Sequence, residues 1–308
     1  MAKVDGNSLV VTSLKNEGVD TVFYITGGPM VDVAAKCIEI GFNSVDVRHE
    51  QGASMAARAY SRVPARPGVC FAASGPGVTN LITGVGNAYL DAVPVVALGG
   101  ASAISQDGMG AFQEMDQVAM FKPITKMSER VKDVRRIPEI INKAFRVATS
   151  GQPGPVYVDL PGDVLYNVVE ENEVGRSQRP HKIPRVSGDP GFIKDAIALL
   201  KGAERPLVIT GTGIIWSGAM QELKEFVEMT GIPFYTTPQG RGVIPEDHAL
   251  SFLGARNRAW KAADVVLIVG TRINFILGFG QAPRFAEDVK MIQVDISDEE
   301  IGRNRAVD

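Results

Sequence analysis

Short apolar runs alternate with longer helical stretches along the first half of the chain. The runs are typical of buried strands and cover residues 21–25, 68–72, 94–98 and 155–159, with one more ending at Glu50. Helices are predicted between them at residues 30–41, 51–62, 78–90 and 136–149, after a first helix that Asn7-Ser8 caps and Gly18 closes. Apolar strands that alternate with helices predict a parallel sheet covered on both faces.

The same pattern returns in the second half of the chain. Residues 171–188 are charged, contain proline and show no periodicity, which is typical of a linker. Strands are then predicted at residues 206–210, 233–236, 264–269 and 289–296, with helices at 190–202 and 217–230. The sequence therefore predicts an α/β protein with two doubly wound parallel-sheet domains, at residues 1–170 and 189–308.

Composition narrows the class of protein. Of the 308 residues, 45% are hydrophobic and 22% charged, as in a soluble globular protein, and a net charge of -3 argues against nucleic acid as the main partner. No apolar run reaches the roughly 18 residues of a transmembrane helix, and residues 1–5 do not begin a signal peptide. Cys37 and Cys70 stand alone in apolar surroundings, which indicates buried thiols rather than a disulfide or a zinc site. We therefore expect a cytoplasmic protein without a membrane partner.

Glu50 is the first candidate for chemistry, because it follows a strand and opens a helix. Side chains at such a turn lie at the carboxyl edge of a parallel sheet, where open α/β folds bind ligands. The local pattern leaves two interpretations. One is a surface glutamate favoured by the helix dipole. The other is a carboxylate that hydrogen-bonds a cofactor and tunes its protonation.

Three further turns carry glycine or polar groups where a ligand would lie. Gly27-Gly28-Pro29 ends one strand, and Ser74-Gly75-Pro76-Gly77 begins a helix after another. Such a glycine-rich turn permits close approach and offers free N–H groups, although it also serves simply to pack a helix on a strand. Gly108–Gln117 is a loop with an aromatic residue, an amide and two acids, and by composition alone it is a surface loop.

Together these stretches resemble a known family. The motifs, in order, are Arg48-His49-Glu50-Gln51, Ser74-Gly75-Pro76-Gly77-Val78-Thr79-Asn80, Asp91-Ala92-Val93-Pro94-Val95 and Ala111-Phe112-Gln113-Glu114-Met115-Asp116. Their order and spacing resemble those of thiamine-diphosphate-dependent enzymes, in the group that contains acetolactate synthase, oxalyl-CoA decarboxylase and 2-hydroxyacyl-CoA lyase. The first domain is similar to the pyrimidine-binding domain of that group, and the resemblance covers the whole chain.

The resemblance implies roles for particular residues. Glu50 would hydrogen-bond the aminopyrimidine of thiamine diphosphate and favour its imino tautomer, and Glu50 and Gln113 would be catalytic. The cofactor-binding residues implied are Gly27, Gly28, Pro29, Glu50, Ser74, Gly75, Pro76 and Asn80. Phe112 and Gln113 would face the substrate. A Tyr-Glu pair is expected there in the decarboxylase, so Phe112-Gln113 favours a lyase or an acetolactate synthase.

In the second domain, Gly211-Thr212-Gly213 follows a strand, as in the dinucleotide-binding fingerprint Gly-x-Gly-x-x-Gly. The third glycine of that fingerprint is absent, because position 216 is Trp216. The triplet is therefore interpreted mainly as a close strand-to-helix turn. Middle domains of the resembled group are Rossmann-like and hold FAD or the ADP part of CoA in some members. Flavin enzymes carry Gly-Met-His-Gly and Arg-Phe-Asp-Asp stretches where this chain has Gly254–Arg258 and Gly270–Phe275. Arg256, Arg258 and Arg272 would then bind acyl-CoA phosphates. Thr212 departs from the lysine expected in the acyl-CoA branch.

The function that the resemblance implies is a carbon–carbon lyase that cleaves 2-hydroxyacyl-CoA to formyl-CoA and an aldehyde or ketone. Oxalyl-CoA decarboxylase and acetolactate synthase are the enzyme alternatives, and a non-catalytic nucleotide-binding subunit is the alternative of another class. No Gly-Asp-Gly motif occurs in the 308 residues. We therefore expect the diphosphate-binding domain to be absent from this chain, and Mg²⁺ to bind through that domain on a longer chain or a second one. A homo-oligomer (dimer or tetramer) and ADP as an activator are further expectations.

Overall fold

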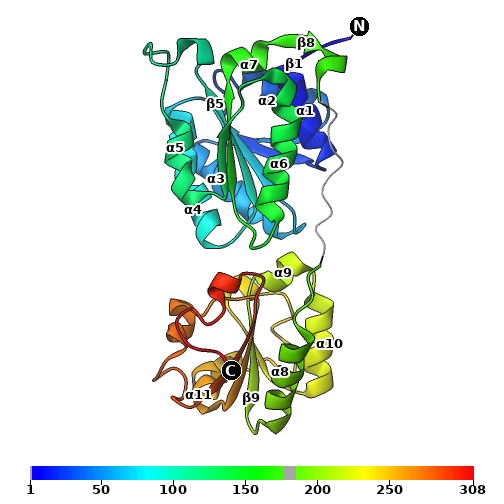
Figure 1. Ribbon diagram of the computed structural model, residues 1–308, viewed down its shortest axis with the longest axis vertical. Helices are drawn as coiled ribbons and strands as arrows, with labels where there is room; N and C mark the ends of the chain where they lie inside the picture. The colour runs from blue at the N-terminus through cyan, green and yellow to red at the C-terminus, as the bar shows by residue number, and fades with distance from the viewer. Residues whose placement is uncertain (1, 176–184) are drawn as a thin grey trace. The chain divides into compact units, whose positions relative to one another are not determined.

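The computed structural model describes residues 2–175 and 185–308, which form two compact units divided between Ile183 and Pro184 (Figure 1). His181 and most of the predicted linker lie outside the described residues. Each unit has a parallel sheet with helices on both faces, as the sequence predicts. Among the described residues, no helix is both long and apolar enough to cross a bilayer.

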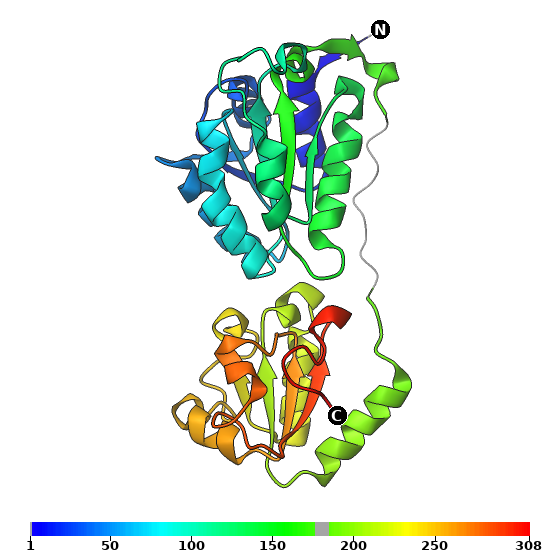
Figure 2. The same ribbon diagram turned by 60° about the vertical axis from the view of Figure 1, so that its left-hand side comes forward.

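The first unit is built on a six-stranded parallel sheet in the order β3-β2-β4-β5-β7-β6. The turned view of Figure 2 shows helices on both sides of this sheet. Its strands are β2 (Thr21–Tyr24), β3 (Asn43–Asp46), β4 (Gly68–Ala72), β5 (Val95–Ala101), β6 (Met127–Arg130) and β7 (Val156–Pro161). Its helices are α1 (Gly6–Asn16), α2 (Val31–Glu39), α3 (Glu50–Arg62), α4 (Pro76–Leu90), α5 (Gln117–Phe121), α6 (Ile137–Thr149) and α7 (Gly162–Tyr166). Apolar side chains of α1, α2 and α6 pack against one face of the sheet, and α3, α4 and α5 lie on the other (Figure 1).

Three features of the first unit were not predicted. Asp5 caps α1, its side chain accepting the Ser8 N–H at 2.7 Å, whereas the predicted cap residue Asn7 is buried and donates to the Leu165 carbonyl at 3.0 Å. The half-buried strand β6 adds an edge to the sheet. β1 (Lys3–Asp5) and β8 (Val168–Glu170) form a separate antiparallel pair.

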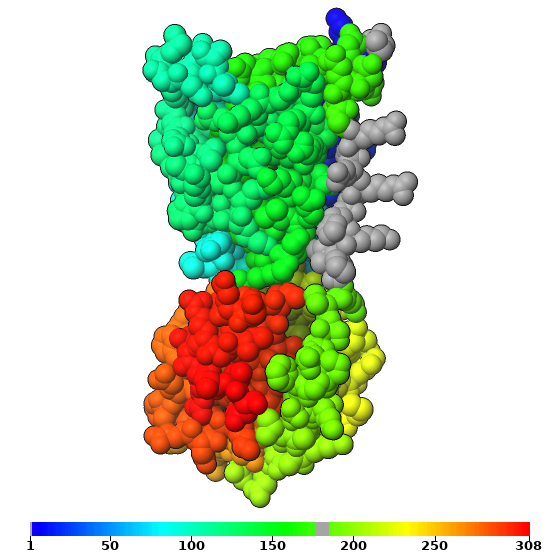
Figure 3. All heavy atoms as spheres, in the orientation of Figure 1, coloured from blue at the N-terminus to red at the C-terminus, as the bar shows by residue number. Residues whose placement is uncertain are grey.

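The second unit has a four-stranded parallel sheet in the order β10-β9-β11-β12. Its strands are β9 (Pro206–Thr210), β10 (Phe234–Thr236), β11 (Val265–Val269) and β12 (Lys290–Val294), and its helices are α8 (Pro190–Gly202), α9 (Gly213–Ser217), α10 (Met220–Thr230) and α11 (Arg256–Ala262). Separate apolar clusters cover the two faces of the sheet. Within this unit, the C-terminal residues, coloured red, form much of the surface that faces the viewer in Figure 3.

The helix predicted over residues 217–230 begins at Met220 rather than at residue 217, as α10, and the short helix α9 precedes it. Gly218 ends α9 with φ +64°, in the left-handed region that glycine adopts without a steric penalty, and α10 starts at Met220. Cys37 and Cys70 are free and buried, as predicted, and burial raises the pKa of each thiol to about 12.

Candidate active site

Four loops meet at the carboxyl edge of the first sheet because its strands are parallel. The loops after β2, β3 and β4 are neighbours, since β2 lies between the other two strands in the sheet. They carry Gly27-Gly28-Pro29, Glu50 and Ser74-Gly75. The fourth loop, which carries Gln113, follows β5. The structure therefore brings residues from distant parts of the sequence to one edge.

Glu50 is the first residue of α3, directly after the N-cap residue His49, whose ring accepts the Gln51 N–H at 3.1 Å. The Glu50 side chain is half-buried, and its Oε2 accepts a hydrogen bond from Asn80 Nδ2 of α4 at 2.9 Å. Gly77 lies against the other oxygen, because a Cβ there would come within 3.3 Å of Oε1. The carboxylate is thus oriented toward the start of α4, between two helices that pack closely together.

Ser74 connects three loops. Its N–H donates to the Gly28 carbonyl at 3.1 Å, and its hydroxyl lies 2.9 Å from Gln113 Oε1 and 3.2 Å from the same carbonyl. Gly75 then has φ +61°, and a Cβ there would lie only 2.7 Å from Gln113 Cβ. Glycine is therefore required at position 75 both by its backbone conformation and by the close approach of Gln113.

Gln113 has φ +57°, which is unusual for a residue with a side chain, so packing and hydrogen bonds must hold it in place. The adjacent Phe112 is 79% exposed. The structure thus puts the amide of Gln113 at the sheet edge with Ser74, and leaves the ring of Phe112 open to solvent.

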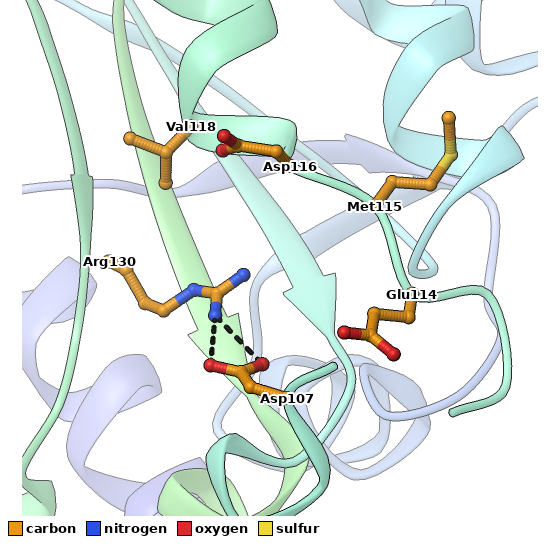
Figure 4. Close-up of a pocket in the computed structure, with 6 residues that line it drawn as sticks. All are labelled: Asp107, Glu114, Met115, Asp116, Val118 and Arg130. Atoms are coloured by element: carbon orange, nitrogen blue, oxygen red, sulfur yellow. Dashed lines mark hydrogen bonds and ion pairs between the residues drawn. The ribbon is translucent and has the colours of Figure 1, made fainter. Parts of the chain in front are cut away.

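The loop that carries Gln113 is folded around Glu114. The carboxylate of Glu114 accepts the N–H groups of Gly108, Gly110 and Ala111, the last two at 3.0 Å, and the bond from Gly108 is the main reason that the pKa of Glu114 is lowered. Arg130 pairs with Asp107 at the other end of the loop, at 3.0 Å. A cavity of about 580 Å³ lies beside this loop (Figure 4). Its lining residues are Asp107, Glu114, Met115, Asp116, Val118 and Arg130.

Sequence reasoning missed a buried polar group behind this loop. Gln117 and Asp159 are 1% and 0% exposed, and the Gln117 amide nitrogen lies 2.6 Å from Asp159 Oδ1. Burial raises the pKa of Asp159, although its hydrogen bond from Tyr157 and the charge of Arg130 act in the opposite direction. The only signal in the sequence was an acid at the end of an otherwise apolar strand.

In the second unit, glycines bring two loops close together at the carboxyl edge. A Cβ on Gly211 would lie 2.4 Å from Thr271 Cβ, and one on Gly213 would lie 2.6 Å from the Gly270 Cα. The Gly213 N–H donates to the Gly270 carbonyl at 2.9 Å. These contacts explain the Gly211-Thr212-Gly213 triplet by packing between the loops after β9 and β11.

Buried polar atoms without partners cluster at the same edge. Within the described residues, the hydroxyls of Thr210 and Thr212 and the indole N–H of Trp216 are buried and have no hydrogen-bond partner. Thr210 ends β9, and the other two residues cap or belong to α9. Because buried polar atoms are nearly always hydrogen-bonded, a ligand or water is expected to bind here.

The predicted arginines fall into two places. Arg272 follows β11 at the carboxyl edge, where its charge acts on Asp295, a carboxyl after β12 whose pKa burial raises. Arg256 and Arg258 lie on α11, which leads into the opposite end of β11, and the Arg256 guanidinium stacks 5.5 Å from the Trp260 ring. Asp295 is a candidate ligand-binding residue that was not predicted from the sequence, because the predicted strand 289–296 included it.

Comparison with known families agrees with this architecture. Residues 4–120 match the thiamine pyrophosphate enzyme N-terminal TPP binding domain, and residues 193–308 match the thiamine pyrophosphate enzyme central domain. The chain belongs to the thiamine pyrophosphate enzyme family and carries these two domains. The resemblance seen in the sequence motifs is therefore confirmed.

Relatives from three branches of the family are similar to this chain. The chain is 40% identical over 303 residues to a 2-hydroxyacyl-CoA lyase of Arabidopsis thaliana, which covers 97% of this chain and 53% of the relative. It is 38% identical over 313 residues to a probable acetolactate synthase large subunit of Methanocaldococcus jannaschii, and the match covers 98% of this chain and 53% of the relative. It is 36% identical over 309 residues to oxalyl-CoA decarboxylase of Escherichia coli K12, and this match covers 98% of the chain and 54% of the relative. The chain spans about half the length of each of these relatives.

Proposed function

We propose that this chain supplies the pyrimidine half of the active site in a thiamine-diphosphate-dependent lyase. The substrate is a 2-hydroxyacyl-CoA, and the products are formyl-CoA and an aldehyde or ketone. The most similar of the three relatives described above is named for this activity. The observation that carries the proposal is the half-buried Glu50 carboxylate, which Asn80 orients at the edge of a domain that matches the TPP-binding family.

The residues at this edge fit the pyrimidine of the cofactor. Glu50 offers a carboxylate oxygen that can share a proton with a ring nitrogen, and Asn80 holds the other oxygen in place. Gly77 leaves space beside Oε1, because a Cβ there would come within 3.3 Å of it. When bound, thiamine diphosphate supplies the carbon nucleophile and the electron sink for carbon–carbon cleavage.

Other residues of this edge act on the substrate side. Gln113 presents an amide whose oxygen accepts from Ser74, so its N–H₂ group is available to donate toward a substrate oxygen. Phe112 is exposed beside it and provides an apolar surface that excludes water once a substrate or a second subunit covers it. Gly27, Gly28 and Pro29 form the adjacent wall, which Ser74 connects to Gln113.

The second unit would hold the nucleotide part of CoA, or ADP as an activator, at its carboxyl edge. The hydroxyls of Thr210 and Thr212, which have no hydrogen-bond partner in the described part of the chain, can bond to phosphate or ribose oxygens. Arg272 can contribute positive charge, and Asp295, which follows β12 at the same edge, has a carboxylate that can accept a hydrogen bond from a ribose hydroxyl. Arg256 and Arg258 are placed less favourably, since they lie on the helix that leads to the other edge.

The remaining parts of the active site lie on other domains in this proposal. We place the magnesium ion and the diphosphate on a further domain, and we expect a homo-oligomer in which that domain of one subunit meets this edge of another. The exposed Phe112, at the edge of the site, agrees with such an arrangement because an apolar ring gains from being covered.

An assay with competing substrates tests the proposal. The full-length protein, supplied with thiamine diphosphate and Mg²⁺, should release formyl-CoA and an aldehyde from a 2-hydroxyacyl-CoA. Oxalyl-CoA and pyruvate serve as controls, and both should be poor substrates. Preferred release of carbon dioxide from oxalyl-CoA, or formation of acetolactate from pyruvate, would replace the proposed reaction by one of the alternatives. Absence of any thiamine-dependent turnover would favour a non-catalytic nucleotide-binding subunit.

A further inference from the structure

A buried hydrogen-bond network lies directly behind the Gln113 loop, and none of its members is among the residues that the proposed function places at the cofactor or the substrate. Gln117 is at its centre, as the first residue of α5. Its Oε1 accepts the Gly75 N–H at 2.6 Å, and its Nε2 lies 2.9 Å from the Gly100 carbonyl oxygen, 3.0 Å from Tyr157 Oη and 2.6 Å from Asp159 Oδ1. A single side chain thus connects the turn after β4 to strands β5 and β7.

The orientation of the Gln117 amide is determined by these neighbours. Asp159 can only accept when ionised, and Tyr157 donates its own proton to Asp159 Oδ1 at 2.6 Å, so both require a donor from Gln117. Arg130 Nε binds the other Asp159 oxygen at 2.6 Å and compensates the buried charge. With Nε2 turned toward the acceptors, Oε1 must face Gly75.

The position of Gly75 in turn controls Gln113. The Gly75 backbone, at φ +61° and ψ -115°, is accessible essentially only to glycine, and its N–H points at the Gln117 oxygen. Gln113 packs against Gly75 so closely that a Cβ on the glycine would lie 2.9 Å from the Gln113 carbonyl oxygen. The left-handed conformation of Gln113 persists only while its surroundings hold it there.

From this geometry we infer that Gln117 is a positioning residue, which holds the Ser74-Gly75 turn and Gln113 in the arrangement that the reaction requires. Asp159 and Arg130 act through it by orienting its amide. The inference rests on the proposed function for its catalytic consequence. Its structural consequence, an ordered Gln113 loop, is independent of the reaction.

The first experiment measures hydrogen exchange in the 308-residue chain without cofactor. Gln117→Met keeps the length of the side chain and removes every hydrogen bond. It should accelerate exchange at Gly75 and across residues 107–116 by at least about tenfold, because the local opening free energy falls, while α10 in the second unit stays unchanged. The matched control is Gln221→Met, which replaces an exposed glutamine of α10 by methionine and should leave exchange at Gly75 and residues 107–116 unchanged. Unchanged exchange in Gln117→Met would overturn the inference.

The second experiment uses Gln117→Glu and compares activity with pH in the full-length protein. A second carboxylate would lie about as close to Asp159 as the present 2.6 Å, and two such groups cannot both ionise. Besides Asp159, the charged or titratable groups around position 117 are Tyr157 on β7 and Arg130 on β6. At lower pH the introduced carboxyl group, once protonated, can donate to Asp159 and still accept from Gly75, so activity relative to wild type should rise as the pH falls. Gln117→Met should show no such recovery.

Steady-state constants separate positioning from binding. Gln117→Met should lower kcat by about 10- to 100-fold, as misplacement of a reacting group does, and leave KM for acyl-CoA within about threefold. Equal, pH-independent losses of activity in the two variants would contradict the inference.

If Gln117→Met does not fold, Gln117→Glu provides the exchange measurement, with protection of residues 107–116 expected to increase at low pH. If the wild-type protein cleaves no 2-hydroxyacyl-CoA but the exchange result holds, the proposed function fails and the positioning of the loop stands.

Discussion

The two units have the same architecture but different carboxyl edges. In the first unit the polar groups at the edge bind one another, as in the pairs Glu50–Asn80, Ser74–Gln113 and Gln117–Gly75. In the second unit the hydroxyls of Thr210 and Thr212 and the indole of Trp216 are buried without partners among the described residues. The same kind of sheet therefore carries one edge that is internally satisfied and one that is not.

The difference indicates two ways of preparing a site. An internally bonded edge has its geometry before any ligand arrives, which suits the orientation of catalytic groups. An edge with unpartnered hydroxyls is left with a penalty of about 1–3 kcal/mol for each buried group, and a ligand that bonds them removes that penalty. The first arrangement favours catalysis, and the second favours binding of a polar nucleotide. The following predictions test this contrast.

Replacement of the Glu50 carboxylate should have the largest effect. Glu50→Gln keeps an oxygen that can accept from Asn80, so the fold should survive, but it cannot hold the proton that the cofactor requires. Turnover should fall by about 10²–10⁴-fold, the usual contribution of a proton-transfer group. Steady-state kinetics and circular dichroism of the full-length protein provide the measurement. Glu139→Gln, at the first turn of α6 and on the surface, should leave kcat unchanged. A folded Glu50→Gln variant with near-normal turnover would rule out the proposed role.

Removal of the Arg272 charge should have the second-largest effect, and it should weaken the binding of acyl-CoA. Arg272→Ala is expected to raise KM for acyl-CoA by about 10- to 150-fold, equivalent to about 1.5–3 kcal/mol for a charge-assisted hydrogen bond. kcat should change little, because a phosphate far from the reacting carbons is bound equally in the ground and transition states. Arg205→Ala, at the amino end of β9 and exposed, is the control. An unchanged KM, or a yellow protein that retains flavin absorbance after dialysis, would point to acetolactate synthase chemistry.

Matched removal of one hydroxyl from each edge sharpens the comparison. Ser74→Ala leaves Gln113 Oε1 without its donor and should reduce the free energy of unfolding of the first unit by about 1 kcal/mol. Thr210→Val removes a hydroxyl that has no partner among the described residues, so the stability of the second unit should stay within about 0.5 kcal/mol or increase. Denaturation followed by tryptophan fluorescence reports the second unit alone, since Trp216 and Trp260 are the two tryptophans of the chain, and denaturation followed by hydrogen exchange reports the first unit.

The same pair of variants should separate in ligand binding. Thr210→Val is expected to weaken ADP binding several-fold in calorimetric titration, and Ser74→Ala should leave it unchanged. If Thr210→Val destabilises the ligand-free chain as much as Ser74→Ala does, the two edges do not differ in the way described above.

Acidification should produce the smallest effect, at the Gln113 loop. The pKa of Glu114 is lowered in the folded state by the N–H groups of Gly108, Gly110 and Ala111, with the first contributing most. The stability that this carboxylate gives to the loop is therefore present above its ordinary pKa and is lost as the pH falls through the lowered value. Hydrogen-exchange protection of residues 107–116, corrected for intrinsic rates, should decrease by a few-fold in that range. Glu114→Gln should already have the lower protection near neutral pH and should lose the pH dependence.

The sequence was sufficient for features that depend on neighbouring residues. Apolar strands alternating with helices predicted both parallel sheets, and the edge position of Glu50 followed from its place between a strand and a helix. Glycine-rich turns were also recognisable, because the conformations that glycine permits are a local property. The family motifs follow from the same local order, and the domain matches agree with them.

The choice among equally suitable residues required the folded chain. Asp5 and Asn7 are both good helix caps, and Asp5 takes that role while Asn7 donates to the Leu165 carbonyl, 158 positions along the chain. Likewise, the helix predicted from residue 217 begins only at Met220, because the chain turns at Gly218 in the left-handed region.

The sequence by itself determined the layers of this protein and the edge at which its candidate catalytic carboxylate lies. Only the tertiary structure decided how that edge is held together, since Gln117 meets Gly75 and Asp159 across separations of 42 residues in each direction. A buried amide has several possible partners in a sequence, and which of them it bonds depends on how the strands pair. Because such bonds form only after long-range packing has excluded water, no local pattern predicts them.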